Sequence, residues 1–334
     1  MFVLLGISIL LASLLTVNSL ASLALAGIWR VADGFTSGWS AAVRARILFL
    51  LRIAPAALSM FLAVLFLTPA YLAYEPRATT ERVSLKLAAL ALISLVGIGL
   101  AVYRGLAAWR ATQRLTADWK AHGEPVRIEG VGVHAYLIEH KFPIIAIVGV
   151  LRPKLFIARR VLESLTPEEV VAALAHESGH LATRDNLKRG LLRACRDALL
   201  IIPSGRSLDV AWAESSECAA DEYAAREGRE TALNLASALV KIARMIPGGA
   251  RPTMPAGAFL LGDKDAAGVK GRVRRLVQLA SSDKGLQSEK GSLKSMLWWT
   301  SAASFAVFLI VLASTPLVLL TVHSMIERAV LILK

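Results

Sequence analysis

The residues most able to do chemistry lie in one short stretch, H-E-S-G-H, at positions 176–180. On an α-helix, side chains four positions apart lie on one face about 5–6 Å apart, so His176 and His180 can point ring nitrogens at one metal ion. Glu177 can reach a water on that ion, and the small Ser178 and Gly179 leave room for substrate or a neighbouring backbone. H-E-x-x-H is the pattern of zinc peptidases. The structural alternative is a pair of core histidines satisfied by hydrogen bonds.

A third ligand is needed, because catalytic zinc generally takes three protein ligands and keeps one position for water. His122, His134 and His140 precede the motif without ligand spacing. The acidic stretch 211–228 is a better source, with Glu217 as ligand and Asp221, four residues on, as the partner that orients a ligating histidine. Glu214 is the competing ligand, and an ordinary solvated acidic face is the structural alternative.

A helix must carry the motif, and its start is well marked. Thr166 is a good N-cap, Pro167 suits the first helical position and Glu169 completes a capping box. Further helices are predicted at Asp209–Arg226, stopped by Gly228, at 231–246 and at 269–280. The last contains Arg272, Arg274 and Arg275, for which a solvated helix face is favoured over contact with lipid or substrate.

The stretch 143–161, PIIAIVGVLRPKLFIARRV, has two β-rich runs and predicts a hairpin or edge strands. Such an edge could capture an extended peptide by strand addition, or the pair could simply cover the motif helix. Pro247–Lys270 predicts a loop and Ser281–Ser292 a flexible linker. Cys195 and Cys218 are most simply buried small residues. An inhibitory or redox thiolate is the alternative for Cys218.

The rest of the chain is that of a membrane protein. The 334 residues are 55% hydrophobic and 19% charged with a net charge of +13, whereas soluble proteins carry about 25% charged residues. Four stretches have the roughly 20 apolar residues that a spanning helix needs: Phe2–Trp29, Ile53–Tyr74, Leu87–Tyr103 and Leu297–Val322. The first lacks the basic start of a signal peptide. No nucleic-acid motif appears, so we expect the basic residues to face membrane lipid.

The distribution of arginines predicts the orientation. The loop between the first two spans carries four of them against one acid, and the next loop is nearly balanced, so the first loop is expected in the cytoplasm. This predicts three spans over 1–103, a cytoplasmic domain over 104–294, and a fourth span with a short external tail over 295–334. His323 then lies across the membrane from the motif.

Several motifs together resemble one family. They are HESGHLATRDN at 176–186, ECAAD at 217–221, GVLRPKLFIARR at 149–160, SLTPEEVVAALA at 164–175 and RVRRLVQL at 272–279. They resemble the integral-membrane zinc peptidases related to the bacterial β-lactam sensor-transducers, whose cousins are the heat-shock membrane proteases and the prenyl-protein proteases. The resemblance covers about 143–280 at motif level.

This resemblance implies a mainly α membrane protein of the bacterial inner (cytoplasmic) membrane. A cytoplasmic α+β gluzincin-like protease domain would lie between the third and fourth of four transmembrane helices. One Zn²⁺ per chain would be held by His176, His180 and Glu217, with Glu177 as the catalytic base. Asp221 would orient a histidine, and Asp185 would support the helix structurally.

The leading hypothesis is therefore a membrane-embedded zinc endopeptidase that cleaves cytoplasmic or juxtamembrane proteins in regulated, signalling proteolysis. Quality-control or prenyl-protein proteolysis is the alternative within the same chemistry. A non-catalytic receptor with structural zinc is the alternative of another class, and the presence of Glu177 argues against it. Twelve residues follow Val322, so we expect no penicillin-binding sensor domain. The trigger would then come through the spans, self-cleavage, a sensor partner or a second copy of the chain.

Overall fold

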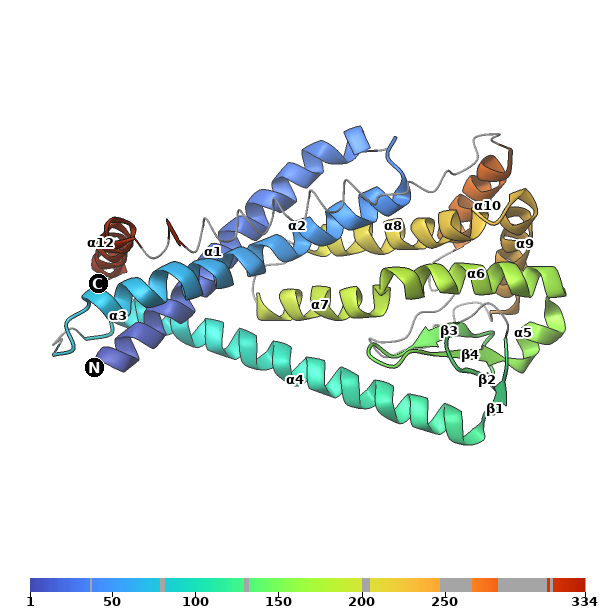
Figure 1. Cartoon of the computed structure of the whole chain (residues 1–334), viewed down its shortest axis with the longest axis horizontal. Helices are drawn as coiled ribbons and strands as arrows, with labels where there is room; N and C mark the ends of the chain where they lie inside the picture. Colours follow the sequence, from blue (N-terminus) through green and yellow to red (C-terminus); the bar gives the residue numbers. More distant parts are fainter. Residues whose placement is uncertain are drawn as a thin grey trace.

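The structure is a computed structural model that describes residues 1–36, 38–78, 82–128, 132–199, 205–246, 266–281, 311–312 and 315–333. Three long helical rods follow the longest axis of the molecule (Figure 1). They are α1 (Phe2–Ala32), α2 (Ala41–Leu62) continued through a π-helical segment η2 (Ala63–Leu67) into α3 (Thr68–Tyr74), and α4 (Leu85–His122). A 3-10 turn, η1 (Asp33–Thr36), follows α1. The prediction of a mainly helical chain is confirmed.

The outward faces of these rods are apolar. Leu4 on α1, Leu58 on α2 and Leu95 on α4 are all exposed, which suits contact with lipid better than contact with water. Within the described residues, four helices are long and apolar enough to cross a membrane: these three rods and α12 (Pro316–Leu333). The expected number of apolar helices is thus confirmed.

The second rod stays helical through two prolines, Pro55 inside α2 and Pro69 in the first turn of α3. A proline inside a helix removes one backbone donor and crowds the preceding turn. Immediately before Pro69 the backbone widens into η2, where the Thr68 hydroxyl donates to the Ala63 carbonyl at 2.8 Å. The rod thus stays helical from end to end. It begins at Ala41, earlier than the predicted Ile53, and ends at Tyr74 as predicted.

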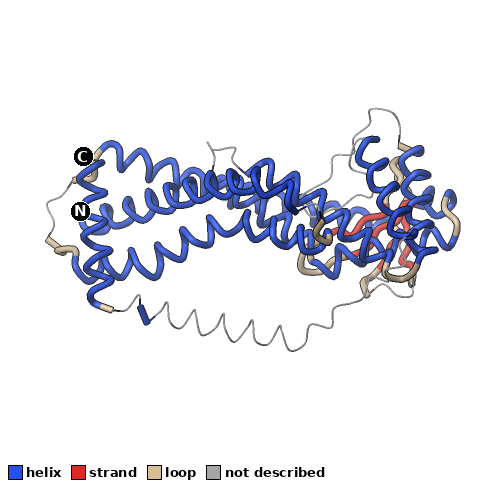
Figure 2. Tube along the Cα trace, turned by 90° about the horizontal axis from the view of Figure 1, so that it is seen from above, coloured by secondary structure: helices blue, strands red, loops and turns tan. Residues whose placement is uncertain are grey.

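Helix α12 lies across the end of the rods instead of along them (Figures 1 and 2). The Tyr74 hydroxyl donates to the Pro316 carbonyl at its start (3.5 Å), and the Ser84 hydroxyl donates to the Leu333 carbonyl at its end (2.9 Å). Tyr74 and Ser84 flank one loop, the loop between α3 and α4. Together they hold both ends of α12, an 18-residue helix about 27 Å long. Most of the predicted span Leu297–Val322 lies outside the described residues. The chain continues as helix to Leu333, where a tail was expected after His323.

A four-stranded sheet follows α4. Its strands are β1 (Glu124–Val126), β2 (Ala135–Ile138), β3 (Ile145–Val148) and β4 (Lys154–Ala158), in the order β1-β2-β4-β3. Strands β2 and β4 are parallel, and the other pairs are antiparallel. The predicted hairpin is confirmed as β3–β4, which turns at Gly149 with a φ of 107° that favours glycine. Strand β3 is an edge of this sheet.

Six helices complete the described polar portion: α5 (Arg159–Ser164), α6 (Pro167–Thr183), α7 (Asp185–Ala198), α8 (Arg206–Ala225), α9 (Arg229–Met245) and α10 (Ala266–Ser281). Helix α6 packs against β3, α8 and α9 (Figure 1), and they share one core that includes Phe156, Ala172 and Leu235. Residues 266–270 of the predicted loop are helical in α10. The rest of that loop, 247–265, and the predicted linker from 282 on lie outside the described residues.

Candidate metal centre

Helix α6, which carries the motif, starts as predicted. Thr166 Oγ1 accepts from the Glu169 backbone N–H at 3.3 Å, and the Glu169 carboxylate accepts from the Thr166 N–H at 2.8 Å. The same carboxylate accepts from Ser237 at 2.6 Å and from Lys241 at 2.8 Å, both on α9. One residue therefore caps α6 and ties it to its neighbour, which fixes where the turns that carry the motif lie.

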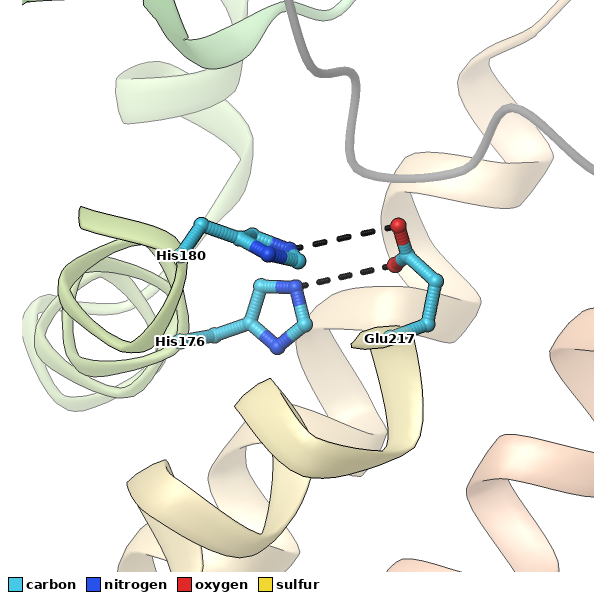
Figure 3. Close-up of side chains that lie close together, drawn as sticks. All are labelled: His176, His180 and Glu217. Atoms are coloured by element: carbon cyan, nitrogen blue, oxygen red, sulfur yellow. Dashed lines mark ion pairs between the residues drawn. The ribbon is translucent and has the colours of Figure 1, made fainter. Parts of the chain in front are cut away.

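His176 and His180 project from α6 toward Glu217 on α8 (Figure 3). The Nε2 atoms of the two histidines lie 3.8 and 3.9 Å from the Glu217 carboxylate oxygens. The three ligand atoms all lie within 4.8 Å of one another, so the group could hold a metal ion. Two imidazoles and one carboxylate are a donor set of catalytic zinc sites. Glu214, the competing ligand, is exposed and is not part of the group.

A glycine allows α8 to come this close. A Cβ atom on Gly179 would lie 3.1 Å from both Ala220 Cα and Tyr223 Cβ, tighter than ordinary van der Waals contact. The motif helix therefore meets α8 backbone to backbone, one turn from Glu217. The expectation that a small residue here leaves room for a neighbouring backbone is confirmed.

Gly179→Val is expected to push α8 away from α6. Overpacking of this kind costs about 1–3 kcal/mol of stability and moves Glu217 off the two histidines, so zinc affinity in detergent should fall together with the melting temperature. Gly190→Val on α7 is the matched control, because no atom lies within 4 Å of the Cβ position there. Equal effects of the two substitutions would contradict the close-approach role.

The second ring nitrogen of each histidine lies against a carboxylate. His176 Nδ1 is 3.0 Å from Asp221 Oδ1, and His180 Nδ1 is 2.8 Å from Asp185 Oδ2. Such contacts fix the ring orientation and turn each Nε2 toward Glu217. The Nε2 of His176 also lies 3.5 Å from Arg272 Nη2. Burial lowers the pKa of His176, which favours the neutral imidazole that metals bind. Asp185 was expected to support the helix behind the ligands, and the structure places it on His180.

Glu177 is fully buried beside the histidines. Its Oε2 accepts from the backbone N–H of Ile147 on edge strand β3 at 3.3 Å, and its Oε1 is buried with no hydrogen-bond partner among the described residues. Burial raises the pKa of the Glu177 carboxyl to about 7. A carboxylate with one committed oxygen, one uncommitted oxygen and a pKa near neutrality is suited to take and return a proton.

A pocket of about 370 Å³ adjoins His180, between the β3–β4 turn and the junction of α6 with α7. Leu151, Leu181 and Leu187 give it an apolar lining. Asn186 holds the two sides together, because its side-chain amide donates to the carbonyls of Ile147 at 2.8 Å and of Gly149 at 3.1 Å. The pocket therefore lies next to both the candidate metal ligands and the end of the edge strand.

Arg272 of α10 also belongs to the site. A solvated helix face was predicted for the arginines of this helix, and that prediction is wrong for Arg272. Its guanidinium donates to both Asp221 oxygens at 2.8 and 2.6 Å, and its Nη1 lies 3.0 Å from Glu217. Although burial raises the pKa of the Asp221 carboxyl, Arg272 holds it well below its usual range. Arg272 is thus a cation that offsets the buried carboxylates around His176. Arg274, two residues on, is exposed as predicted.

Arg272→Met is expected to lower the free energy of unfolding by about 3–5 kcal/mol, because it leaves the buried Asp221 carboxylate without its cation. Arg274→Met removes the same charge from the exposed face of the same helix and should change stability by less than about 0.5 kcal/mol. Thermal unfolding in detergent compares the two. Similar melting temperatures would show that Arg272 is not needed to offset Asp221.

Cys195 and Cys218 are both free and partly buried. Burial raises the pKa of both thiols, which disfavours the thiolate needed for metal binding or redox chemistry. This fits the prediction that they are small packing residues.

Comparison with known proteins adds no relative to this picture. No protein-family model matches the chain, and no curated protein matches it significantly.

Proposed function

We propose that this protein is a membrane-embedded zinc endopeptidase that cleaves cytoplasmic or juxtamembrane protein substrates. The observation that carries the proposal is the placement of Glu177 beside the group formed by His176, His180 and Glu217. The donor set suits zinc, and the uncommitted Oε1 of Glu177 suits a base that awaits a water. A purely structural zinc site has no need of such a carboxylate.

The chemistry divides between the ion and the chain. Zinc held by His176, His180 and Glu217 would supply Lewis-acid activation of water and of a substrate carbonyl. Glu177 takes the proton of the attacking water and returns it to the leaving amine. Asp221 and Asp185 hold the two imidazoles in orientation while this happens.

The edge strand gives a natural position for substrate. The Ile147 N–H donates to Glu177 and the Ile147 carbonyl accepts from Asn186, so the edge of the buried strand β3 lies against the proposed base. An extended peptide that pairs with β3 would replace these two side-chain contacts, which would bring its scissile bond near Glu177. The pocket beside His180 would then take a large apolar side chain of the substrate.

The membrane part of the proposal rests on the three apolar rods, because α12 lies across their end. With the positively charged first loop in the cytoplasm, the sheet and helices α5–α10 face the cytoplasm of a bacterial inner membrane. The resemblance to the β-lactam sensor-transducer peptidases favours regulated, signalling proteolysis as the setting.

Removal and return of zinc tests the function directly. Detergent-purified protein is expected to cleave casein or itself, to stop in 1,10-phenanthroline, and to regain activity when zinc is added back. Purified protein that binds no metal would contradict the proposal. A chain that binds zinc and cleaves no substrate would favour the non-catalytic receptor.

A further inference from the structure

A second group of metal-binding side chains lies at the other end of the molecule. It consists of Glu75, directly after α3, and of His323 and Glu327 on α12, and their ligand atoms all lie within 4.8 Å of one another. The ligand atoms of the His176 group lie within the same limit. Figure 1 places α3 and α12 at the opposite end of the rods from α6, so the two groups cannot share an ion.

The surroundings of the group are unusual for ordinary surface residues. Glu75 is only 7% exposed. His323 Nδ1 is buried and makes no hydrogen bond among the described residues, while Nε2 lies 4.0 Å from Glu327. The Tyr74 ring, 6.0 Å from the His323 ring, packs beside it. A buried ring nitrogen without a hydrogen-bond partner calls for an explanation, and a bound ion is one.

An exposed pair elsewhere in the chain shows what is distinctive here. His122 and Asp118 on α4 are also four residues apart and lie 3.4 Å from each other, but both are well exposed. They are not part of any such group within the described chain. At His323, by contrast, the third donor comes from a different element.

We propose that Glu75, His323 and Glu327 form a second metal site, selective for a divalent transition metal such as zinc, which fastens α12 to the end of α3. One imidazole with two carboxylates suits zinc, whereas calcium and magnesium prefer oxygen ligands alone. A divalent cation between the two carboxylates would attract both at once. The site is independent of the peptidase function. In the orientation predicted from the arginines, this second metal site faces the external medium.

The test counts zinc ions and locates them in the full-length, detergent-purified, chelator-stripped chain. Wild type is expected to bind two zinc equivalents. Glu327→Gln and Glu75→Gln, which keep side-chain size on two different elements, should each bind one. His176→Ala should also bind one, and His122→Ala should bind two.

Hydrogen exchange identifies which site each equivalent fills. Zinc is expected to slow amide exchange in residues 316–333 by at least about tenfold in wild type and in His176→Ala, and to leave it unchanged in Glu327→Gln. Two retained equivalents in both Gln variants, or no zinc effect on α12 in His176→Ala, would overturn the second site. Neither result would bear on the peptidase site, which the loss of one equivalent in His176→Ala reports separately.

Discussion

Glu177→Gln is expected to slow casein cleavage by about 10³-fold, within the range that loss of a general base produces. The substitution keeps the size of the side chain and its contact with the Ile147 N–H, but it removes the carboxylate that accepts the proton of the attacking water. Because Glu177 is not among the three residues whose ligand atoms converge, zinc content should equal that of wild type. The measurement is initial rate and zinc content on the same preparation.

Glu168→Gln is the matched control for that experiment. Glu168 lies on the same helix but is exposed in its first turn, so its loss should leave the cleavage rate within about twofold. A Glu177→Gln enzyme that retained more than a tenth of wild-type activity would show that another group acts as the base.

Glu217→Ala is expected to cost one zinc equivalent and all cleavage. Even residues that merely orient a zinc ligand contribute about 10–100-fold to metal affinity, so removal of a ligand should weaken binding more than 100-fold. Among the described residues, Glu217 is the one carboxylate whose ligand atom converges with those of the two histidines, so the histidines alone should hold zinc much more weakly.

Glu214→Ala separates the two candidate ligands. Glu214 lies one turn before Glu217 on α8 and is exposed, so its variant should keep both zinc and activity. The reverse pattern, with zinc lost in Glu214→Ala and kept in Glu217→Ala, would mean that α8 presents a different face to the motif when metal is bound.

The part of the site that depends on short-range spacing could be predicted from the sequence. The capping box at Thr166 sets the start of α6, and the four-residue spacing then places His176 and His180 on one face. Glu217 and Asp221 follow the same logic on α8. Which face of each helix points at the other depends on how α6 packs against α8. In the sequence, the small residue Gly179 indicated this close packing.

What the sequence could not supply is long-range packing. Arg272 lies 51 positions from Asp221 in the chain, and nothing in its local pattern separates it from the exposed Arg274. Helix α7 was not predicted, although its leucines recur with helical spacing at Leu187, Leu191 and Leu192. The apolar run that ends in α12 predicts a helix, but length and composition do not fix its direction relative to its neighbours.

The length of α7 sets the distance between His180 of the candidate metal centre and Arg104 on α4. Asp185 at one end of α7 holds His180, and Asp197 near the other end pairs with Arg104 at 3.1 Å, where the apolar part of α4 gives way to polar residues. Twelve residues of helix correspond to about 18 Å. With the apolar part of α4 in the bilayer, an extended chain that emerges from the same membrane covers that height in about five or six residues. The length of α7 would thus fix the height above the membrane at which a peptide bond can be cleaved. Membrane-anchored substrates would be selected by the number of residues between their membrane segment and the scissile bond.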